Sequence, residues 1–380
     1  DLVPTSEFHL TILYNKQLQN QIFLNTKTMK QLFILSLAFL AITSCRKVES
    51  DGQKEIVIIN GGGSNTSATA NTVTLSGRIT RDTTLFAKDN NFLSGLVYIT
   101  RGVTLTVEAG ATVKGQFSGA DVSALIVCRG GKIIAQGTVD KPIIFTSASA
   151  NPQSGDWGGI VLCGTAPINT SFTVNGTAVN GLYQVEGGVD NANGDGLAGA
   201  GDAAFPTANP ADNSGILKYV RIEYAGYAYQ PDKEINSLTM AAVGNGTTID
   251  HVEAAFGKDD SFEWFGGTVN CKYLIAYKGQ DDDFDTDNGY SGNVQFGIAI
   301  RDSAIADISK SEAFESDNNA TGTTATPKTS AVFSNMTVIG PRATLANIGN
   351  SLFLAGAQIR RNSGISIQNS IFLGWPTALL

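Results

Sequence analysis

The sequence is short of histidine and of positive charge, and both shortages exclude classes of function. Its 380 residues include only 2 histidines, and 26 lysines and arginines stand against 34 aspartates and glutamates. The resulting net charge of -8 argues against nucleic acid as a partner, because contacts to phosphates need a basic surface.

Cysteine is scarce too, with 4 residues in the chain. None stands in a CxxC pair or beside a histidine, which argues against a zinc site. Cys128, Cys163 and Cys271 each lie in an apolar run, so we expect buried free thiols. Apolar stripes with a helical period are also missing, and we therefore expect few helices.

The first feature that is present is an export signal. Met29 opens "MKQLFILSLAFLAITSC", in which a lysine precedes an apolar run. This run is too short to span a bilayer, since spanning takes about 20 residues. We predict a signal peptide at 29–44 and lipidation of Cys45, because "LAITSC" resembles a bacterial lipobox. An ordinary signal peptide with an incidental cysteine is the alternative.

The segments on either side follow from that prediction. Residues 1–28 precede the expected start and are interpreted as upstream sequence translated by error. Residues 45–72 contain "NGGGSNTSATAN" and are predicted to be the lipidated cysteine with a flexible tether. The protein would then be exported and held at the outer membrane through its lipid.

A recurring phrase indicates the fold of the remainder, residues 73–380. Five copies combine a polar pair, an alternating apolar run and a final glycine: "LKYVRIEYAG" (217–226), "TIDHVEAAFG" (248–257), "NCKYLIAYKG" (270–279), "FSNMTVIG" (333–340) and "IQNSIFLG" (367–374). Two of them begin 22 residues apart, which suits one coil of a solenoid whose stacked copies bury their apolar faces together. We predict an all-β, right-handed parallel β-helix with inserted loops; a sandwich or propeller of hairpins is the alternative.

Longer motifs carry a resemblance to a known family. "GVTLTVEAGATVKG", "GDWGGIVLCGTAPIN", "DDSFEWFGGTVN" and "DDDFDTDNGYSGNVQFGIAIRD" resemble secreted Gram-negative β-helix lipoproteins of the pectate-lyase-like superfamily. The resemblance runs from about Leu75 to the last residue. It implies the fold and the export, but no particular reaction. Members of the family usually continue further, so we expect the β-helix to be incomplete at its C-terminal end.

An acidic stretch, "QDDDFDTDNGYSG", is the main candidate site. Asp260 and Asp282 are 22 residues apart, so they should stack in adjacent coils. Like charges that close need protons, water or a cation, and calcium prefers six to eight oxygen ligands. The predicted calcium ligands are Asp260, Glu263, Asp281, Asp282, Asp283, Asp285 and Asp287. The alternative is a set of solvated side chains that hydrogen-bond the turns.

The same stretch allows a catalytic interpretation. Asp282 and Asp283 are candidates for paired acids that cleave a glycosidic bond. Arg301 or Lys278 is the candidate base of a calcium-dependent polysaccharide lyase. The Gly-His-Gly segment expected of a polygalacturonase-like hydrolase is missing, which weakens the hydrolase interpretation.

A second calcium loop is predicted in "NANGDGLAGAGD". Asn191, Asn193, Asp195 and Asp202 occupy positions 1, 3, 5 and 12 of a spacing that resembles an EF-hand loop. A plain insertion in the solenoid is the alternative.

One aromatic residue is the candidate for contact with sugar. Trp264 stands between Glu263 and Phe265 in "EWFGG", and an exposed indole can stack on a sugar ring. A place in the core is the alternative. Together these features favour an exported, lipid-anchored binding protein for glycans or surface proteins, associated with calcium and without catalysis. A calcium-dependent lyase or a glycoside hydrolase is the rival hypothesis.

Overall fold

A computed structural model describes residues 48–50, 53–55, 58–60, 70–230, 233–342, 344, 346 and 349–380. The predicted upstream segment (1–28), signal peptide (29–44) and lipidated Cys45 lie outside these residues, so they stay predictions. In the part of the chain that is described, no helix is long and apolar enough to cross a membrane. The helix η1 (Gly119–Asp121) is a short 3₁₀ turn.

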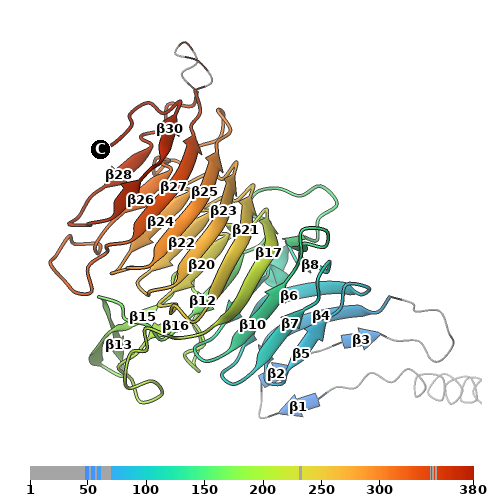
Figure 1. Ribbon diagram of the computed structural model, residues 1–380. Coiled ribbons are helices and arrows are strands. Elements are labelled where there is room, and N and C mark those ends of the chain that lie inside the picture. Colours follow the sequence, from blue (N-terminus) through green and yellow to red (C-terminus); the bar gives the residue numbers. More distant parts are fainter. Residues whose placement is uncertain are drawn as a thin grey trace, which may run out of the picture. The chain divides into compact units, whose positions relative to one another are not determined.

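Parallel strands dominate the described chain. They form a 22-stranded sheet in which every pair is parallel except β3 (Ile58–Asn60), which runs antiparallel to β4 (Thr72–Ile79). Figure 1 shows these strands stacked as successive coils along one axis. The predicted right-handed parallel β-helix is confirmed, and a sandwich or propeller of hairpins is excluded.

The β-helix begins with coils that precede its two continuous faces. These first coils consist of β4, β5 (Thr83–Leu85), β6 (Asn90–Ile99), β7 (Thr104–Val107), β8 (Thr112–Gly115), β10 (Lys132–Gln136) and β11 (Ile143–Ser147).

The recurring phrase of the sequence builds the first of these, here called the long-strand face. It consists of β17 (Gly215–Glu223), β21 (Thr248–Ala255), β23 (Asn270–Tyr277), β25 (Asn293–Ile300) and β27 (Val332–Ile339), followed by β29 (Ser366–Gln368) and β30 (Ile371–Leu373). Thr248 pairs with Asn270, so phrases one coil apart lie side by side as predicted. Each long strand bends at a left-handed residue, such as Tyr219, His251 or Tyr273, with φ of 48°, 55° and 58°.

The second face, here called the short-strand face, carries the acidic residues. It consists of β9 (Ala124–Val127), β12 (Ile160–Cys163), β20 (Leu238–Ala241), β22 (Phe262–Phe265), β24 (Phe284–Asp287), β26 (Phe314–Ser316) and β28 (Ala357–Ile359). Its inward side chains include Phe262, Phe284 and Phe314, whose rings stack with centroids 5.9 and 5.2 Å apart. This stack fixes the register, because a slip of one residue would turn the phenylalanines out to solvent.

The three cysteines after Cys45 belong to the interior. Cys128, Cys163 and Cys271 are buried free thiols, as predicted. Burial raises the pKa of Cys163 and of Cys271 to about 12, which keeps both protonated and unreactive at neutral pH.

Short antiparallel hairpins interrupt the coils, and one more precedes them. They pair β13 (Ser171–Val174) with β14 (Thr177–Asn180), β15 (Leu182–Gln184) with β16 (Leu197–Gly199), β18 (Ala228–Gln230) with β19 (Lys233–Glu234), and β1 (Val48–Ser50) with β2 (Gln53–Glu55). In Figure 1 the strands β13, β15 and β16 project beside the start of the short-strand face. The predicted inserted loops are therefore present, and one of them borders the acidic residues.

Candidate functional site

A cleft with a volume of about 640 Å³ runs along the short-strand face. Its acidic lining residues are Glu186, Glu234, Asp259, Asp260, Glu263, Asp281, Asp282, Asp285, Asp307 and Glu315. Three basic residues, Lys258, Lys310 and Arg360, line it as well. Because carboxylates outnumber basic side chains, the electrostatic potential of the cleft is negative and favours cations.

One acidic row comes from the strands themselves. Glu263 on β22 pairs in register with Asp285 on β24, which pairs with Glu315 on β26. Because β24 alternates, Phe284 and Thr286 point into the core while Asp285 points outward. Neighbouring strands lie about 4.8 Å apart, so this register places three carboxylates in a line along the β-helix.

A second acidic row comes from the turns that lead into these strands. The backbone N–H of Asp282 donates to Oδ1 of Asp260 over 2.8 Å. The N–H of Glu312 donates in the same way to Oδ1 of Asp282 over 2.6 Å. The prediction that Asp260 and Asp282 stack in adjacent coils is therefore confirmed, and Glu312 continues the row.

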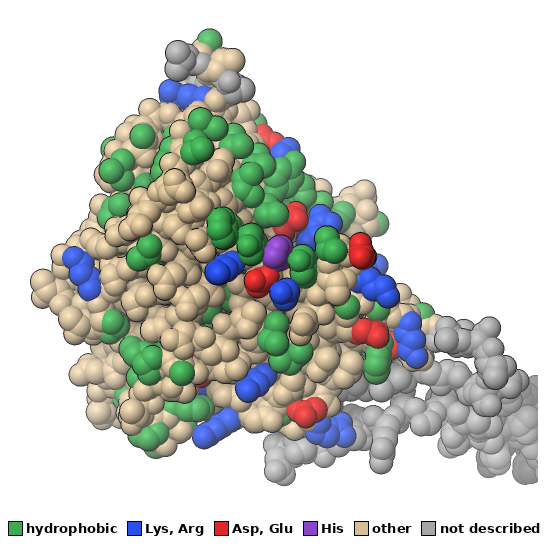
Figure 2. Space-filling view, viewed as in Figure 1, with side chains coloured by type: hydrophobic (Ala, Val, Ile, Leu, Met, Phe, Trp, Pro, Cys, Tyr) green, Lys and Arg blue, Asp and Glu red, His purple; other side chains and the backbone are tan. Residues whose placement is uncertain are grey.

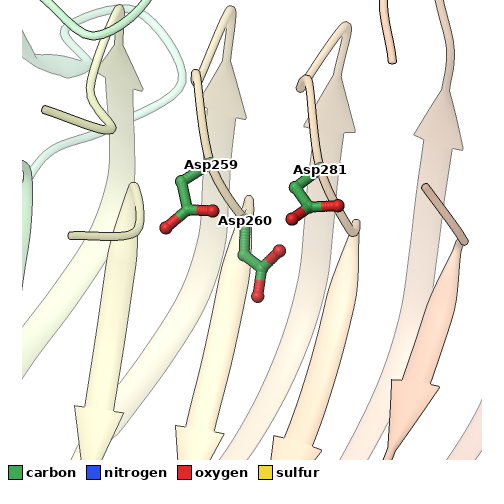
Figure 3. Close-up of side chains that lie close together, drawn as sticks. All are labelled: Asp259, Asp260 and Asp281. Carbon is green, nitrogen blue, oxygen red and sulfur yellow. The ribbon is translucent and has the colours of Figure 1, made fainter. Parts of the chain in front are cut away.

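Carboxylates of the two rows, together with Asp259 and Asp281 from the same turns, converge into three groups. In each group, one oxygen from every member lies within 4.8 Å of the others. The groups are Asp259, Asp260 and Asp281; Asp260, Glu263 and Asp285; and Asp282, Glu312 and Glu315. Figure 3 shows the first of them, in which two neighbouring turns direct their carboxylates toward one another.

Several carboxylate oxygens of these groups have no hydrogen-bond donor. Asp281 Oδ1, Asp285 Oδ1 and both carboxylate oxygens of Glu312 are buried and accept no hydrogen bond. Burial, and then the neighbouring carboxylates, raise the pKa values of Asp260 and Asp282 well above their ordinary range. Buried carboxylates without donors need either protons or a bound cation.

One guanidinium offsets part of the charge at the far end of the row. Arg360 forms an ion pair with Glu315, and its Nε lies 3.0 Å from Oδ1 of Asp317. Among the described residues, no ion pair involves Asp260, Asp282 or Glu312. The middle of the cleft is therefore its most negative part.

Comparison with known proteins assigns the fold to a family. The family model described as a pectate-lyase like beta helix domain matches residues 77–379. The chain belongs to this family. No curated protein and no solved structure matches it significantly. The resemblance stated from sequence is thus confirmed at the level of the pectate-lyase-like β-helix, while lipidation and a Gram-negative source stay predictions.

In this β-helix, Asp283 does not belong to the predicted calcium site. Its side chain points inward, where Oδ1 lies 2.8 Å from Nη1 of Arg301, and both side chains are fully buried. The prediction that Asp283 is a calcium ligand or a catalytic acid is wrong, because the side chain faces the interior and not the cleft.

The same contact overturns the prediction that Arg301 is a catalytic base. Its guanidinium is buried in the ion pair and also donates to the backbone carbonyls of Gln280 and Asp281. Arg301 therefore holds the acidic turn in place from inside. Lys278, the other candidate base, lies 3.2 Å from Asp302 and does not line the cleft.

Asp287 lies beyond the three groups. Its Oδ1 accepts the backbone N–H of Asn288 over 2.6 Å. The side chain lines a neighbouring polar pocket of about 790 Å³, between the β13–β15 insertion and the loop after β26. Burial raises the pKa of Asp287 to about 7, but the predicted role in the same calcium site is wrong because of this position.

The predicted calcium loop at 191–202 is not formed. Asp195 makes an ion pair of 2.8 Å with Arg78, and Asp202 makes one of 2.6 Å with Arg129. Asn191 donates to Asp195 and accepts from the backbone of Asn193, so these oxygens are engaged within the loop. The spacing of the acids had suggested that calcium neutralises them, but arginines from distant coils supply that positive charge.

The prediction that Trp264 stacks on sugar is also wrong. Its side chain is fully buried, and its ring packs 5.3 Å from the ring of Tyr290. Strand alternation explains this position, because Glu263 takes the outward place on β22 and Trp264 therefore points inward.

The sequence did not single out Glu312 and Glu315, which form the third group together with Asp282. The coil that carries them contains an insertion, so they follow Asp282 and Asp285 by 30 residues and not by 22. A signal was present: "SFEWF", "DDFDT" and "EAFES" each place an acidic residue directly after a phenylalanine. Aligning these three phrases would have located the strand row of acids.

Proposed function

We propose that the protein is an exported, lipid-anchored binding protein whose β-helix presents a calcium-loaded acidic cleft to a glycan or to another surface protein. The observation that carries the proposal is the convergence of Asp260, Glu263 and Asp285, whose carboxylate oxygens lie within 4.8 Å of one another at the centre of the cleft. A single hard cation shared by the three would neutralise them together.

The chemistry of the central group suits calcium. Calcium takes about six to eight oxygen ligands at about 2.3–2.6 Å and accepts flexible geometry. Three carboxylates supply part of this shell, and Asn236, whose side chain contacts Glu263, borders the same space. Asp285 is only half-buried in the lining of the cleft, so water or hydroxyl groups of a sugar can reach a bound cation there and complete its coordination. That access is the reason for proposing a glycan as a ligand.

The positions of His251 and Arg301, two residues that could act as general bases, support binding over catalysis. The cleft lining contains no histidine. His251 lies on the long-strand face, stacked between Tyr219 and Tyr273 with ring centroids 4.4 and 4.3 Å apart. Figure 2 shows that face, on which apolar side chains gather among charged ones. Arg301, the base suggested by the sequence, is sealed in its ion pair with Asp283.

The rival proposal is a calcium-dependent lyase or a glycoside hydrolase, and one observation favours it. Lys258, Lys310 and Arg360 line the same cleft as the carboxylates, so a basic side chain and a bound cation would be close together. In a lyase, such a base removes a proton from an acidic sugar whose carboxylate the cation holds. This alternative therefore needs a direct assay.

A polysaccharide panel separates the two proposals. Purified protein is incubated with acidic and neutral polysaccharides in calcium, and unsaturated products and new reducing ends are measured. Binding without product supports the binding proposal. Product that is lost in Asp285→Asn, but kept in Asp140→Asn, would overturn it; Asp140 is an exposed acid between β10 and β11, away from the cleft.

The anchor has its own test. Mass spectrometry of the mature N-terminus should find a lipid on Cys45, and Cys45→Ala should release the protein from membranes. An unmodified N-terminus at another residue would contradict the proposed anchoring and leave the cleft unaffected.

A further inference from the structure

Glu312 lies beneath the lining of the cleft and is the most deeply buried carboxylate of the three groups. Only 1% of its surface is exposed, and neither carboxylate oxygen accepts a hydrogen bond. Its own backbone N–H is engaged with Oδ1 of Asp282, which fixes the start of the side chain beside that carboxylate. The side chain is therefore held in place, yet its charged end has no donor.

The unpartnered end of Glu312 points at two other acids. Oxygens of Glu312, Asp282 and Glu315 all lie within 4.8 Å of one another. Asp282 and Glu312 come from consecutive turns of the β-helix, and Glu315 from β26. This group shares no residue with the central group of Asp260, Glu263 and Asp285. Two separate triads thus lie about one coil apart on the same face.

The nearest cationic side chain does not satisfy this group. Arg360 pairs with Glu315 and Asp317. In the described part of the chain no ion pair reaches Glu312 or Asp282. One of the three carboxylates is partly offset, and the two buried ones face each other without a counter-ion.

We propose that Asp282, Glu312 and Glu315 hold a second divalent cation of the calcium type, one coil along from the central one. The inference uses other ligands than the proposed function, and rests on it only in that both cations lie in one cleft. Arg360 then competes with the second cation for Glu315, so it limits the affinity of that position more strongly than that of the central one, where it has no ion pair with a ligand.

The competing account is a proton. Asp282 and Glu312 sharing a single proton would also remove the repulsion between them, and no metal would bind. The two accounts differ in stoichiometry and in the effect of Arg360, and both quantities are measurable.

The test is calorimetric titration of the purified full-length protein with calcium alone after treatment with EDTA. Wild type should bind two ions per chain. Glu312→Gln, which keeps the size of the side chain, should reduce this to one, and Glu263→Gln should remove the other ion. Arg360→Gln should bind the second ion at least several-fold more tightly, and Asp140→Asn should match wild type.

Each result decides the matter. Two ions in wild type and one in Glu312→Gln support the inference. One ion in wild type, unchanged in Glu312→Gln and lost in Glu263→Gln, overturns it and leaves the proposed function standing. No binding to any variant overturns both. If a variant fails to fold, its far-UV circular dichroism shows this, and Arg360→Gln then carries the test, since unchanged affinity in that variant would contradict the inference.

Discussion

The backbone N–H of Asp282 donates to the carboxylate of Asp260 across one coil of the β-helix, over 2.8 Å. The backbone amide of one turn therefore holds the carboxylate of the preceding turn in position. Glu312 repeats the contact with Asp282, so the acidic row is part of the regular winding of the chain. The row is therefore pre-organised, and a cation would bind without rearrangement of the backbone.

We first predict that calcium stabilises the folded protein. A ligand that binds only the folded state adds about 2.7 kcal/mol at a concentration of 100 times its Kd. The melting temperature should rise by several degrees with calcium, and it should rise less in Asp260→Asn, which disturbs the central group but keeps the carboxylates of the second. Asp140→Asn is the matched control and should respond like wild type. An identical melting temperature with EDTA and with millimolar calcium would remove the calcium proposal.

The second prediction concerns pH in the metal-free protein. Burial raises the pKa of Asp281 and of Asp287 from 3.8 to about 7. Such groups bind more protons in the folded state than in the unfolded state, so stability falls as pH rises from about 4 to about 7. We expect a lower urea midpoint at pH 8 than at pH 5 in EDTA.

Calcium and one variant provide the controls for this pH dependence. Each unit of pKa shift corresponds to about 1.4 kcal/mol, so the loss should reach several kcal/mol. Saturating calcium should remove the part of the profile that comes from Asp281, because the cation stabilises the ionised acids of the cleft, and should leave the part from Asp287. Asp281→Asn should flatten it in part. A urea midpoint that rises with pH in EDTA would show that folding does not raise the pKa values of these acids.

A third prediction follows from the buried ion pair of Asp283 and Arg301. Removing one partner of a buried pair costs about 3–5 kcal/mol, because the other charge stays buried alone. Arg301→Met should therefore lower the free energy of unfolding in urea by roughly this amount. It should also weaken calcium binding, because Arg301 holds the carbonyls of Gln280 and Asp281.

The double variant Asp283→Leu/Arg301→Met separates the two effects. It should regain much of the stability, since no charge is left unpaired, but it should not regain calcium affinity. Lys278→Ala, which breaks a half-buried pair with Asp302, should change both properties much less. Full affinity in Arg301→Met would show that the acidic turn holds its shape without the arginine.

The fourth prediction is that Trp264 contributes to stability and not to ligand contact. Replacing a buried tryptophan by alanine costs about 3–5 kcal/mol. Trp264→Ala should lower the urea midpoint accordingly, whereas Trp264→Phe should cost less. Binding of a glycan to the folded fraction of Trp264→Phe should equal that of wild type. A specific loss of glycan affinity with unchanged stability would restore the platform hypothesis.

The fold was predictable because it repeats. Each phrase on the long-strand face buries its alternating apolar residues only when stacked on its neighbours, and the spacing of Thr248 and Asn270 gave the length of a coil. The same spacing placed Asp260 beside Asp282. Sequence periodicity thus located both the architecture and the centre of the acidic cleft.

The misplaced residues depended on information that periodicity does not contain. The direction of Asp283 is decided at a turn, where alternation stops, and its partner Arg301 lies in the following coil. Asp195 and Asp202 fit a calcium-loop spacing, but Arg78 and Arg129 reach them from coils earlier in the chain. Spacing alone does not reveal which charges a solenoid brings together from a distance.

The last prediction tests that interpretation of the 191–202 loop. If arginines replace calcium there, Asp202→Asn should leave the number of bound calcium ions unchanged. It should instead loosen the insertion, because the buried Arg129 loses its carboxylate partner and keeps only weaker contacts, with the carbonyl of Gly199 and the ring of Phe205. Hydrogen exchange should then quicken in β15 and β16 and stay unchanged in β22 and β24. Loss of one calcium ion in Asp202→Asn would instead show that the loop binds metal, and that its arginine contacts give way to it.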